Sequence, residues 1–202
     1  MITRREAGLD TAVVLLLCGV YVLVHTAGLL VRWIIPAVLV SFLLYALAVL
    51  RRRGDTWRDL GVRSDNLFEA GWRVGVWTLL GAALILAWAW WVGSGWRPEL
   101  LVLLPLYPLW GILQQLIFQG ILLRRLLVLV ENRWVALIFT AILFGFVHLG
   151  NLQLVLLTAL GGGVWSWFFQ RWPNVLVLGA SHGILAALAY PLLLSKNPLE
   201  TF

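Results

Sequence analysis

Five polar side chains of this 202-residue chain lie inside long apolar stretches, where polar groups are rare. Three are amides, at Gln114, Gln115 and Gln119, and two are imidazoles, at His148 and His182. A polar group in hydrocarbon costs free energy unless it finds a partner, so such side chains turn toward one another, toward water or toward a ligand. Imidazoles exchange protons near neutral pH, and an amide carbonyl can orient a water molecule. We therefore predict that these residues form a functional polar site.

The composition places this site in a membrane protein. Hydrophobic residues make up 62% of the chain and charged residues only 12%, whereas soluble domains are about 45–50% apolar and about 25% charged. The net charge of +6 comes from basic residues that bracket apolar segments, so we expect no nucleic-acid partner. Cys18 is the only cysteine, which excludes a disulfide framework or a thiolate metal site within one chain.

Windows of about 20 apolar residues, the length that crosses a bilayer, give seven candidate spans. They lie at approximately residues 9–31, 33–50, 67–93, 100–130, 133–149, 152–171 and 174–194. Pro105 and Pro108 are expected to divide the fourth into a short interfacial helix and a main span of about residues 107–130. We predict an all-α fold, a polytopic membrane helical bundle of about seven or eight transmembrane helices, with residues 1–202 in a single membrane domain.

The basic residues predict the orientation of this bundle. If the N-terminus is cytoplasmic, twelve of the 15 basic residues lie inside, and only Arg32, Arg97 and Lys196 lie outside. Because cytoplasmic loops are rich in Lys and Arg, this distribution favours an inside N-terminus and an outside C-terminus. The first span has no clear small-residue cleavage site, so we expect it to be retained. The short chain favours a bacterial or archaeal plasma membrane.

Two further segments have a predicted structural role. The polar connection from Arg51 to Asn66 retains Trp57 and Leu60, and we predict a surface-lying element whose basic residues contact anionic headgroups. A solvated segment that only sets the orientation explains it equally well. The glycines at 161–163 interrupt the sixth span, where they permit close helix packing or, alternatively, a local break beside a cavity.

Helical spacing groups the polar residues. Gln115 and Gln119 are four residues apart and share a helix face, while Gln114 points about 100° away from Gln115. Phe144 lies four residues before His148, so an aromatic ring should pack one turn from that imidazole. His182 lies on a third predicted helix, the span at about residues 174–194. We therefore expect three helices to converge on one small chamber.

These residues resemble the motifs of the CAAX protease and bacteriocin-processing family of glutamic intramembrane proteases. The family's Glu-Glu-x-x-x-Arg motif aligns with Gln114–Gln119, its Phe-x-x-x-His motif is intact as Phe144–His148, and its His-x-x-x-Asn motif aligns with His182–Ala186. The resemblance covers roughly residues 110–194, and the family-like catalytic-type core lies at about 107–194. The resemblance implies that the catalytic positions are Gln114, Gln115, Gln119, His148 and His182. It implies supporting positions at Phe118, Phe144 and Ala186.

In that family a glutamate is thought to activate water, while the histidines and the asparagine hold the water or stabilise the oxyanion. Glutamine cannot accept a proton usefully near neutral pH, so its presence should lower catalysis by about 10²–10⁴-fold unless another group acts as the base. His148 or His182 could take that role. Alternatively, both are neutral partners of the glutamines and tie the helices together by hydrogen bonds worth about 0.6–2 kcal/mol each. His25 matches no motif and is expected to be a packing or interfacial residue.

Two functions therefore remain open. One is an intramembrane endopeptidase, a hydrolase of peptide bonds with an atypical Gln/His site. The other is a catalytically inactive relative that binds peptide segments or scaffolds a partner protein. Besides membrane lipids, the expected ligand is a hydrophobic or lipidated peptide, prenylated CAAX peptides and bacteriocin-type peptides both being family possibilities. We expect no cofactor and no metal, because catalytic zinc normally has three protein ligands and a Gln amide is a poor third.

Overall fold

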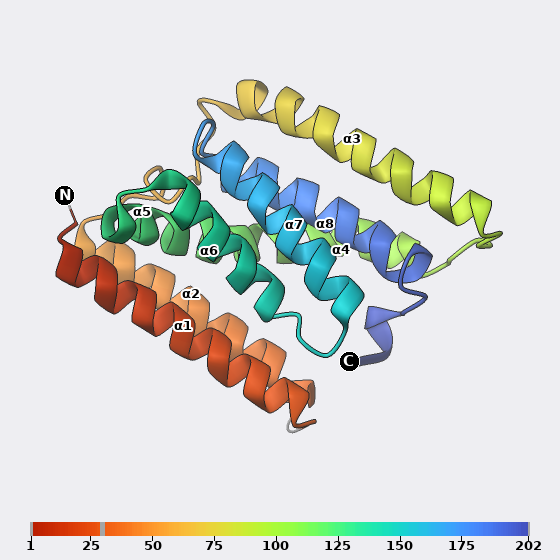
Figure 1. The fold of residues 1–202 in the computed structure, drawn as a ribbon, viewed down its shortest axis with the longest axis horizontal. Helices are drawn as coiled ribbons and strands as arrows, with labels where there is room; N and C mark the ends of the chain where they lie inside the picture. Colours follow the sequence, from red (N-terminus) through yellow and green to blue (C-terminus); the bar gives the residue numbers. More distant parts are fainter. Residues whose placement is uncertain (1, 29–30, 202) are drawn as a thin grey trace.

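The computed structural model describes residues 2–28 and 31–201 and is all-α (Figure 1). One helix runs without interruption from Leu100 to Val130, so the described residues form seven long helices and a short C-terminal one. The elements are α1 (Arg4–Thr26), α2 (Val31–Arg53), α3 (Leu67–Trp91), α4 (Leu100–Gln115), the π-helix η1 (Leu116–Leu123), α5 (Arg124–Val130), α6 (Arg133–Phe146), α7 (Leu152–Phe169), α8 (Val175–Leu192) and the 3-10 helix η2 (Pro198–Thr201).

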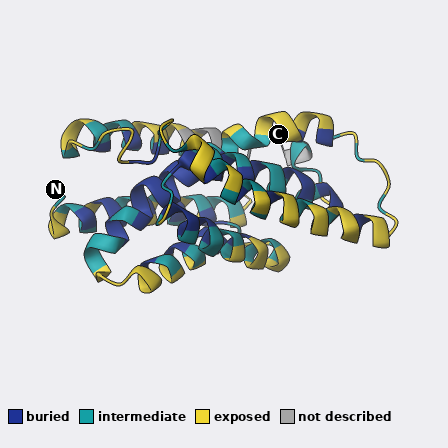
Figure 2. Cartoon of the chain, turned by 90° about the horizontal axis from the view of Figure 1, so that it is seen from above, coloured by how far each residue is buried: buried dark blue, intermediate teal, exposed yellow. Residues whose placement is uncertain are grey.

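Five of the described helices are long and apolar enough to cross a membrane: α1, α3, the continuous α4–η1–α5 helix, α7 and α8. The apolar α6 is shorter, with 14 residues. Exposed surface, which includes many large apolar side chains, runs along the outer helices (Figure 2). The chain is therefore an integral membrane protein, as the composition predicted. The boundary predicted between the first two spans, at residue 32, lies inside α2, which begins at Val31. Residues 29–30 and the side chain of Arg32 are outside the described residues.

The prediction that Pro105 and Pro108 divide the fourth span is wrong. Both prolines lie inside α4, which continues through η1 into α5. Membrane helices tolerate proline where neighbouring helices and local adjustments compensate for the lost hydrogen bond. Here α8 packs directly on the proline segment: a Cβ atom on Gly183 would lie 2.3 Å from the nitrogen of Pro108. The irregular part of this long helix is instead η1.

The α4 and α8 helices touch along their backbones. A Cβ atom on Gly111 would lie 2.3 Å from the carbonyl oxygen of Gly179, and one on Gly179 would lie 2.3 Å from the Cα atom of Ile112. Only glycine permits such an approach, which is a common way for membrane helices to associate. This contact brings the glutamine segment of α4 against the histidine of α8.

The α6 and α7 helices are also held close by glycine. A Cβ atom on Gly162 would lie 2.9 Å from the Cβ atom of Phe144, and one on Gly145 would lie 2.9 Å from the carbonyl oxygen of Val155. Helix α7 runs through residues 161–163 without a break. The expectation of close packing at these glycines is confirmed, and Phe144 is thereby fixed between the two helices.

The connection between α2 and α3 is buried at Leu60 and Gly61, so the prediction of a surface-lying element is wrong at these two residues. Leu60 is fully buried, and the carbonyl oxygen of Gly61 accepts a hydrogen bond from the Val175 amide at 2.9 Å. A Cβ atom on Gly120, within η1, would lie 2.5 Å from the carbonyl oxygen of Leu60. Trp57 stays exposed. Leu60 is thus buried by helices that lie far away in the sequence.

A buried ion-pair network joins α1, α2 and α5 at the same end of the bundle. Arg125 is 1% exposed and donates to Asp10 at 2.9 Å and to Asp55. Arg53 also pairs with Asp10, at 3.2 Å, and Arg124 pairs with Asp55 at 3.4 Å. The sequence predicted Arg124 and Arg125 only as orientation signals and Arg53 also as a headgroup contact, yet each has a carboxylate partner that compensates its loss of hydration.

Candidate functional site

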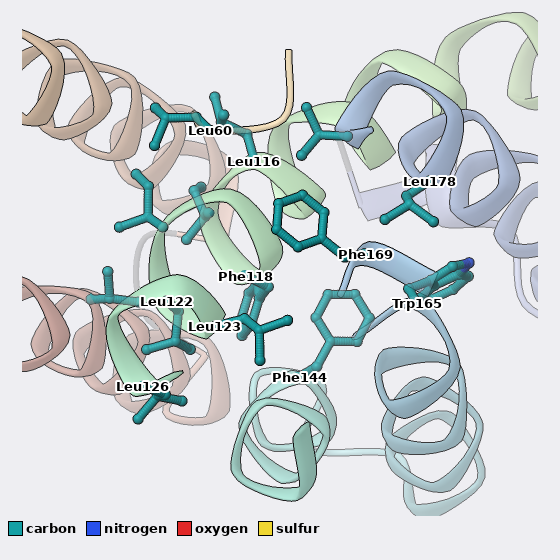
Figure 3. Close-up of a cluster of buried hydrophobic side chains, with 14 of the residues drawn as sticks. Leu60, Leu116, Phe118, Leu122, Leu123, Leu126, Phe144, Trp165, Phe169 and Leu178 are labelled. Carbon is teal, nitrogen blue, oxygen red and sulfur yellow. The ribbon is translucent and has the colours of Figure 1, made fainter. Parts of the chain in front are cut away.

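Phe144 contacts both candidate histidines and is fully buried; Figure 3 shows its ring among buried apolar side chains that include Phe118 and Trp165. Its ring centroid is 5.4 Å from that of His148 and 5.2 Å from that of His182. The rings of Phe118 and Trp165 pack edge-on against it at 4.8 Å and 5.9 Å. The aromatic partner that the spacing predicted for His148 thus contacts both candidate histidines, which come from different parts of the chain.

Gln115 and His182 form a buried pair behind this ring. The Gln115 Nε2 atom lies 3.5 Å from His182 Nδ1, a long hydrogen bond, and both side chains are almost fully buried. With the amide donating, Nδ1 accepts, so a neutral His182 carries its proton on Nε2. The Oε1 atom of Gln115 is buried without a partner among the described residues. This pair links α4 to α8 directly.

Gln119 lies within the π-helix η1 and contacts α7. Its Oε1 atom accepts a hydrogen bond from the Ser166 hydroxyl at 3.0 Å, and both side chains are fully buried. Its Nε2 atom is buried and has no partner within the described chain. Gln115 and Gln119 therefore both point into the protein, as their spacing suggests, but they contact different helices. Short π-helical segments occur frequently at functional sites.

Gln114 points elsewhere, toward two adjoining cavities whose wall it shares with His148. The larger holds about 830 Å³ and is also lined by residues of α1, α4, α8 and the segment before η2. The smaller holds about 60 Å³, and its lining is mainly apolar: Cys18, Val38, Phe42, Leu113, Ile117 and Phe118. Gln115, Gln119 and His182 line neither cavity. The five predicted residues thus form an accessible pair and a buried layer behind it.

The backbone fixes the proton of His148. Its Nδ1 atom lies 2.7 Å from the carbonyl oxygen of Phe144, one turn earlier. A carbonyl can only accept, so Nδ1 donates, and a neutral His148 has its free lone pair on Nε2. The residue is half-buried in the turn that follows α6, and α7 begins after the capping residue Asn151. With Gln115 Nε2 as the donor to His182, the two histidines take opposite tautomers.

The described lining of the two cavities contains no carboxylate. Within the described chain, no group of three or more His, Cys, Asp or Glu residues is placed to hold a metal ion. Ala186 lies on α8 one turn beyond His182, is half-buried and has no polar side-chain atom. The described cavity linings therefore offer imidazoles, amides, tyrosine and serine hydroxyls and the Lys196 ammonium group. Among these groups an imidazole is the one suited to accept a proton near neutral pH.

Several residues around the site were not predicted from the sequence. Ser166 contacts Gln119, and the Trp165 ring lies tilted against His182 with centroids 4.6 Å apart. A serine in an apolar span is a detectable signal, but one tryptophan among 13 is not. His25 stacks on Tyr21 at 5.5 Å, as expected for a packing residue, and it also lines the larger cavity with a buried Nδ1 atom that has no described partner.

Comparison with known families identifies a similarity over nearly half of the chain. Residues 95–188 match the family model described as type II CAAX prenyl endopeptidase Rce1-like. The matched segment extends from just before α4 into α8 and contains all five predicted polar residues, and it confirms the resemblance to CAAX proteases that the three motifs indicated. Neither the curated proteins nor the solved structures give a match.

Proposed function

We propose that the chain is an intramembrane endopeptidase in which His148 replaces the family's glutamate as general base. The observation that carries this proposal is the 2.7 Å contact between His148 Nδ1 and the Phe144 carbonyl. It leaves Nε2 as the basic atom of a residue that lines both cavities. Gln114 lines the same cavities, and its amide group can form a hydrogen bond with the attacking water.

The reaction then follows from these two side chains. His148 Nε2 takes a proton from a water molecule held by Gln114, and the water oxygen bonds to the peptide carbonyl carbon. The Gln114 amide N–H is available to stabilise the negative charge that develops on the carbonyl oxygen. The tetrahedral intermediate collapses as the C–N bond breaks and His148 returns its proton to the leaving amine. The products are a carboxylic acid and an amine, with one water consumed.

The substrate class follows from the larger cavity and from the family similarity. About 830 Å³ accommodates several residues of an extended peptide, and much of the wall is apolar, including Leu103, Leu106, Tyr107 and Trp110. A hydrophobic or lipidated peptide fits this lining. Because the matched family is described as acting on prenyl CAAX substrates, we propose a prenylated CAAX peptide as the first substrate to test and a bacteriocin-type peptide as the second.

The test is peptide cleavage by purified protein in lipid nanodiscs. Prenylated and unprenylated peptides of the same sequence are incubated with it, and new termini are identified by mass spectrometry. His148→Ala should lower the cleavage rate by about 10²–10⁴-fold, the usual contribution of a positioned base. Thr140→Val is the matched control, because Thr140 is buried in α6, donates to the Ala136 carbonyl and is not among the described cavity linings. Equal rates in His148→Ala and the wild type would contradict the proposal.

The second candidate function is peptide binding without hydrolysis. The absence of a carboxylate from the described cavity linings favours it, because the family's own base is missing. In this case the peptides stay intact, yet they bind the wild-type protein and lose affinity when Trp110→Ala alters the apolar wall. Binding with no new termini in any peptide would identify the chain as a noncatalytic relative.

A further inference from the structure

A series of hydrogen bonds runs from Thr78 on α3 to the indole of Trp165, the ring that lies against His182. Trp165 Nε1 donates to Ser181 Oγ at 3.2 Å, and Ser181 Oγ lies 2.7 Å from Thr78 Oγ1. Thr78 Oγ1 in turn lies 2.7 Å from the carbonyl oxygen of Val74. All three side chains of the chain are buried. Buried polar groups are hydrogen-bonded as a rule, and here the partners come from three different helices, α3, α7 and α8.

Counting the protons gives this chain one direction. Thr78 has a single hydroxyl proton, and the Val74 carbonyl can only accept, so Thr78 donates to Val74. Ser181 then donates its own proton to Thr78 and accepts from the Trp165 N–H. In this arrangement each of the three donors has one acceptor. The reverse direction would leave the Ser181 proton without an acceptor among the described groups around it.

The indole of Trp165 connects this chain to the candidate site. Neighbouring residues of a helix point about 100° apart, so Ser181 and His182 cannot bond each other's side chains directly. Trp165 reaches both: its N–H is held by Ser181, and its ring lies against His182 with centroids 4.6 Å apart and planes at 37°. The hydrogen bond from the Trp165 N–H to Ser181 therefore fixes the position of the indole ring that contacts the His182 imidazole.

We propose that Thr78, Ser181 and Trp165 are positioning residues that hold His182 in the orientation in which it meets Gln115. Through this pair they also set the adjacent Gln114 on the cavity wall, a role that rests on the proposed function. Thr78 lies on α3, so the proposal extends the site to that helix. Helix α3 precedes residues 95–188, the segment that matches the family. Helix α3 packs chiefly on α8. The hydrogen bond between Thr78 and Ser181 gives this packing a polar contact that leads to the site.

The test is NMR of the imidazole nitrogens in protein labelled with ¹⁵N-histidine and held in nanodiscs. The His182 signal is identified by its loss in His182→Gln. In Thr78→Val, the share of the minor His182 tautomer or ring orientation should rise roughly 2- to 10-fold, the effect of losing one hydrogen bond. Thr78→Ser restores the hydroxyl and should keep the wild-type signal. Ser181→Ala should act as Thr78→Val does, and the His148 signal should stay unchanged in all of them.

Thr158→Val provides the matched control, because Thr158 is a buried threonine that donates to the Leu154 carbonyl at 2.7 Å and takes no part in the chain. If Ser181→Ala fails to fold, the comparison of Thr78→Val with Thr78→Ser decides alone. An unchanged His182 signal in Thr78→Val, or the same change in Thr158→Val, would overturn the proposal. The NMR measurement needs no substrate. A failure to hydrolyse peptides would therefore count against the proposed function and not against the positioning role of Thr78, Ser181 and Trp165.

Discussion

The Nδ1 atom of His148 lies 2.7 Å from the carbonyl oxygen of Phe144, the residue whose ring also packs against His182. One residue thus orients one imidazole through its backbone and contacts the other through its side chain. The two histidines consequently differ in what they offer: His148 has a free Nε2 lone pair beside the cavities, and His182 has an Nε2 proton in the buried layer.

This difference predicts opposite tautomers for the two histidines. ¹⁵N NMR of the ring nitrogens above pH 7 should show His148 protonated on Nδ1 and His182 protonated on Nε2. Gln115→Leu removes the amide partner of His182 and should alter only the His182 signal. Two histidines with the same protonated nitrogen would contradict the orientation assigned to both hydrogen bonds.

Restoring the carboxylates should affect activity and stability differently at the two positions. Gln114→Glu places an acid on the cavity wall, where it can act as a base, and should raise peptide hydrolysis by up to about 10²–10⁴-fold. Gln115→Glu places a charge at a fully buried position and should lower the melting temperature instead. Hydrolysis and thermal unfolding of each variant, and of the double variant, separate these effects. A gain of peptide hydrolysis in Gln115→Glu but not in Gln114→Glu would assign the catalytic role to the buried residues Gln115, Gln119 and His182.

Gly183→Ala should destabilise the protein by about 1–3 kcal/mol, because the added methyl group would overlap the α4 backbone at Pro108. Gly75→Ala is the control: it lies within α3, and no atom lies within 4 Å of its added Cβ. That change should be neutral or slightly stabilising, since alanine favours helix more than glycine does. Thermal unfolding in one detergent compares the two, and equal melting temperatures would show that the backbone contact is dispensable.

Arg125→Met should lower the free energy of unfolding by about 3–5 kcal/mol, since it removes one partner of a buried ion pair and leaves Asp10 and Asp55 with one arginine each. Glu131→Gln breaks the exposed Arg4–Glu131 pair and should cost no more than about 1 kcal/mol. Chemical denaturation in mixed micelles measures both. A similar loss in the two variants would mean that burial does not distinguish these pairs.

Chelators should leave peptide hydrolysis unchanged. The described residues offer no group of three or more metal-ligating side chains, and the proposed reaction uses only an imidazole and an amide. Cleavage rates measured with and without 1,10-phenanthroline test this expectation. A loss of cleavage that added Zn²⁺ restores would assign the water activation to a metal ion.

The sequence by itself determined the membrane class, the helical architecture and the family resemblance. These depend on local properties, namely the length of apolar runs and the spacing of residues along one helix. The contact between Phe144 and His148 is an example, because four residues make one helical turn wherever the helix is placed. The motif order along the chain was equally readable, and the family match over residues 95–188 agrees with it.

Only the tertiary structure decided which polar groups meet and which of them reach a cavity. The pairing of Gln115 with His182 depends on where α4 and α8 cross, and that crossing is set by the backbone contact of Gly111 with Gly179. The same holds for the unbroken helix at Pro105 and for the burial of Leu60, both of which reflect packing against distant segments. Hydropathy measures the transfer of a residue into lipid, whereas a partner is chosen by contacts between helices, which no single window of sequence contains.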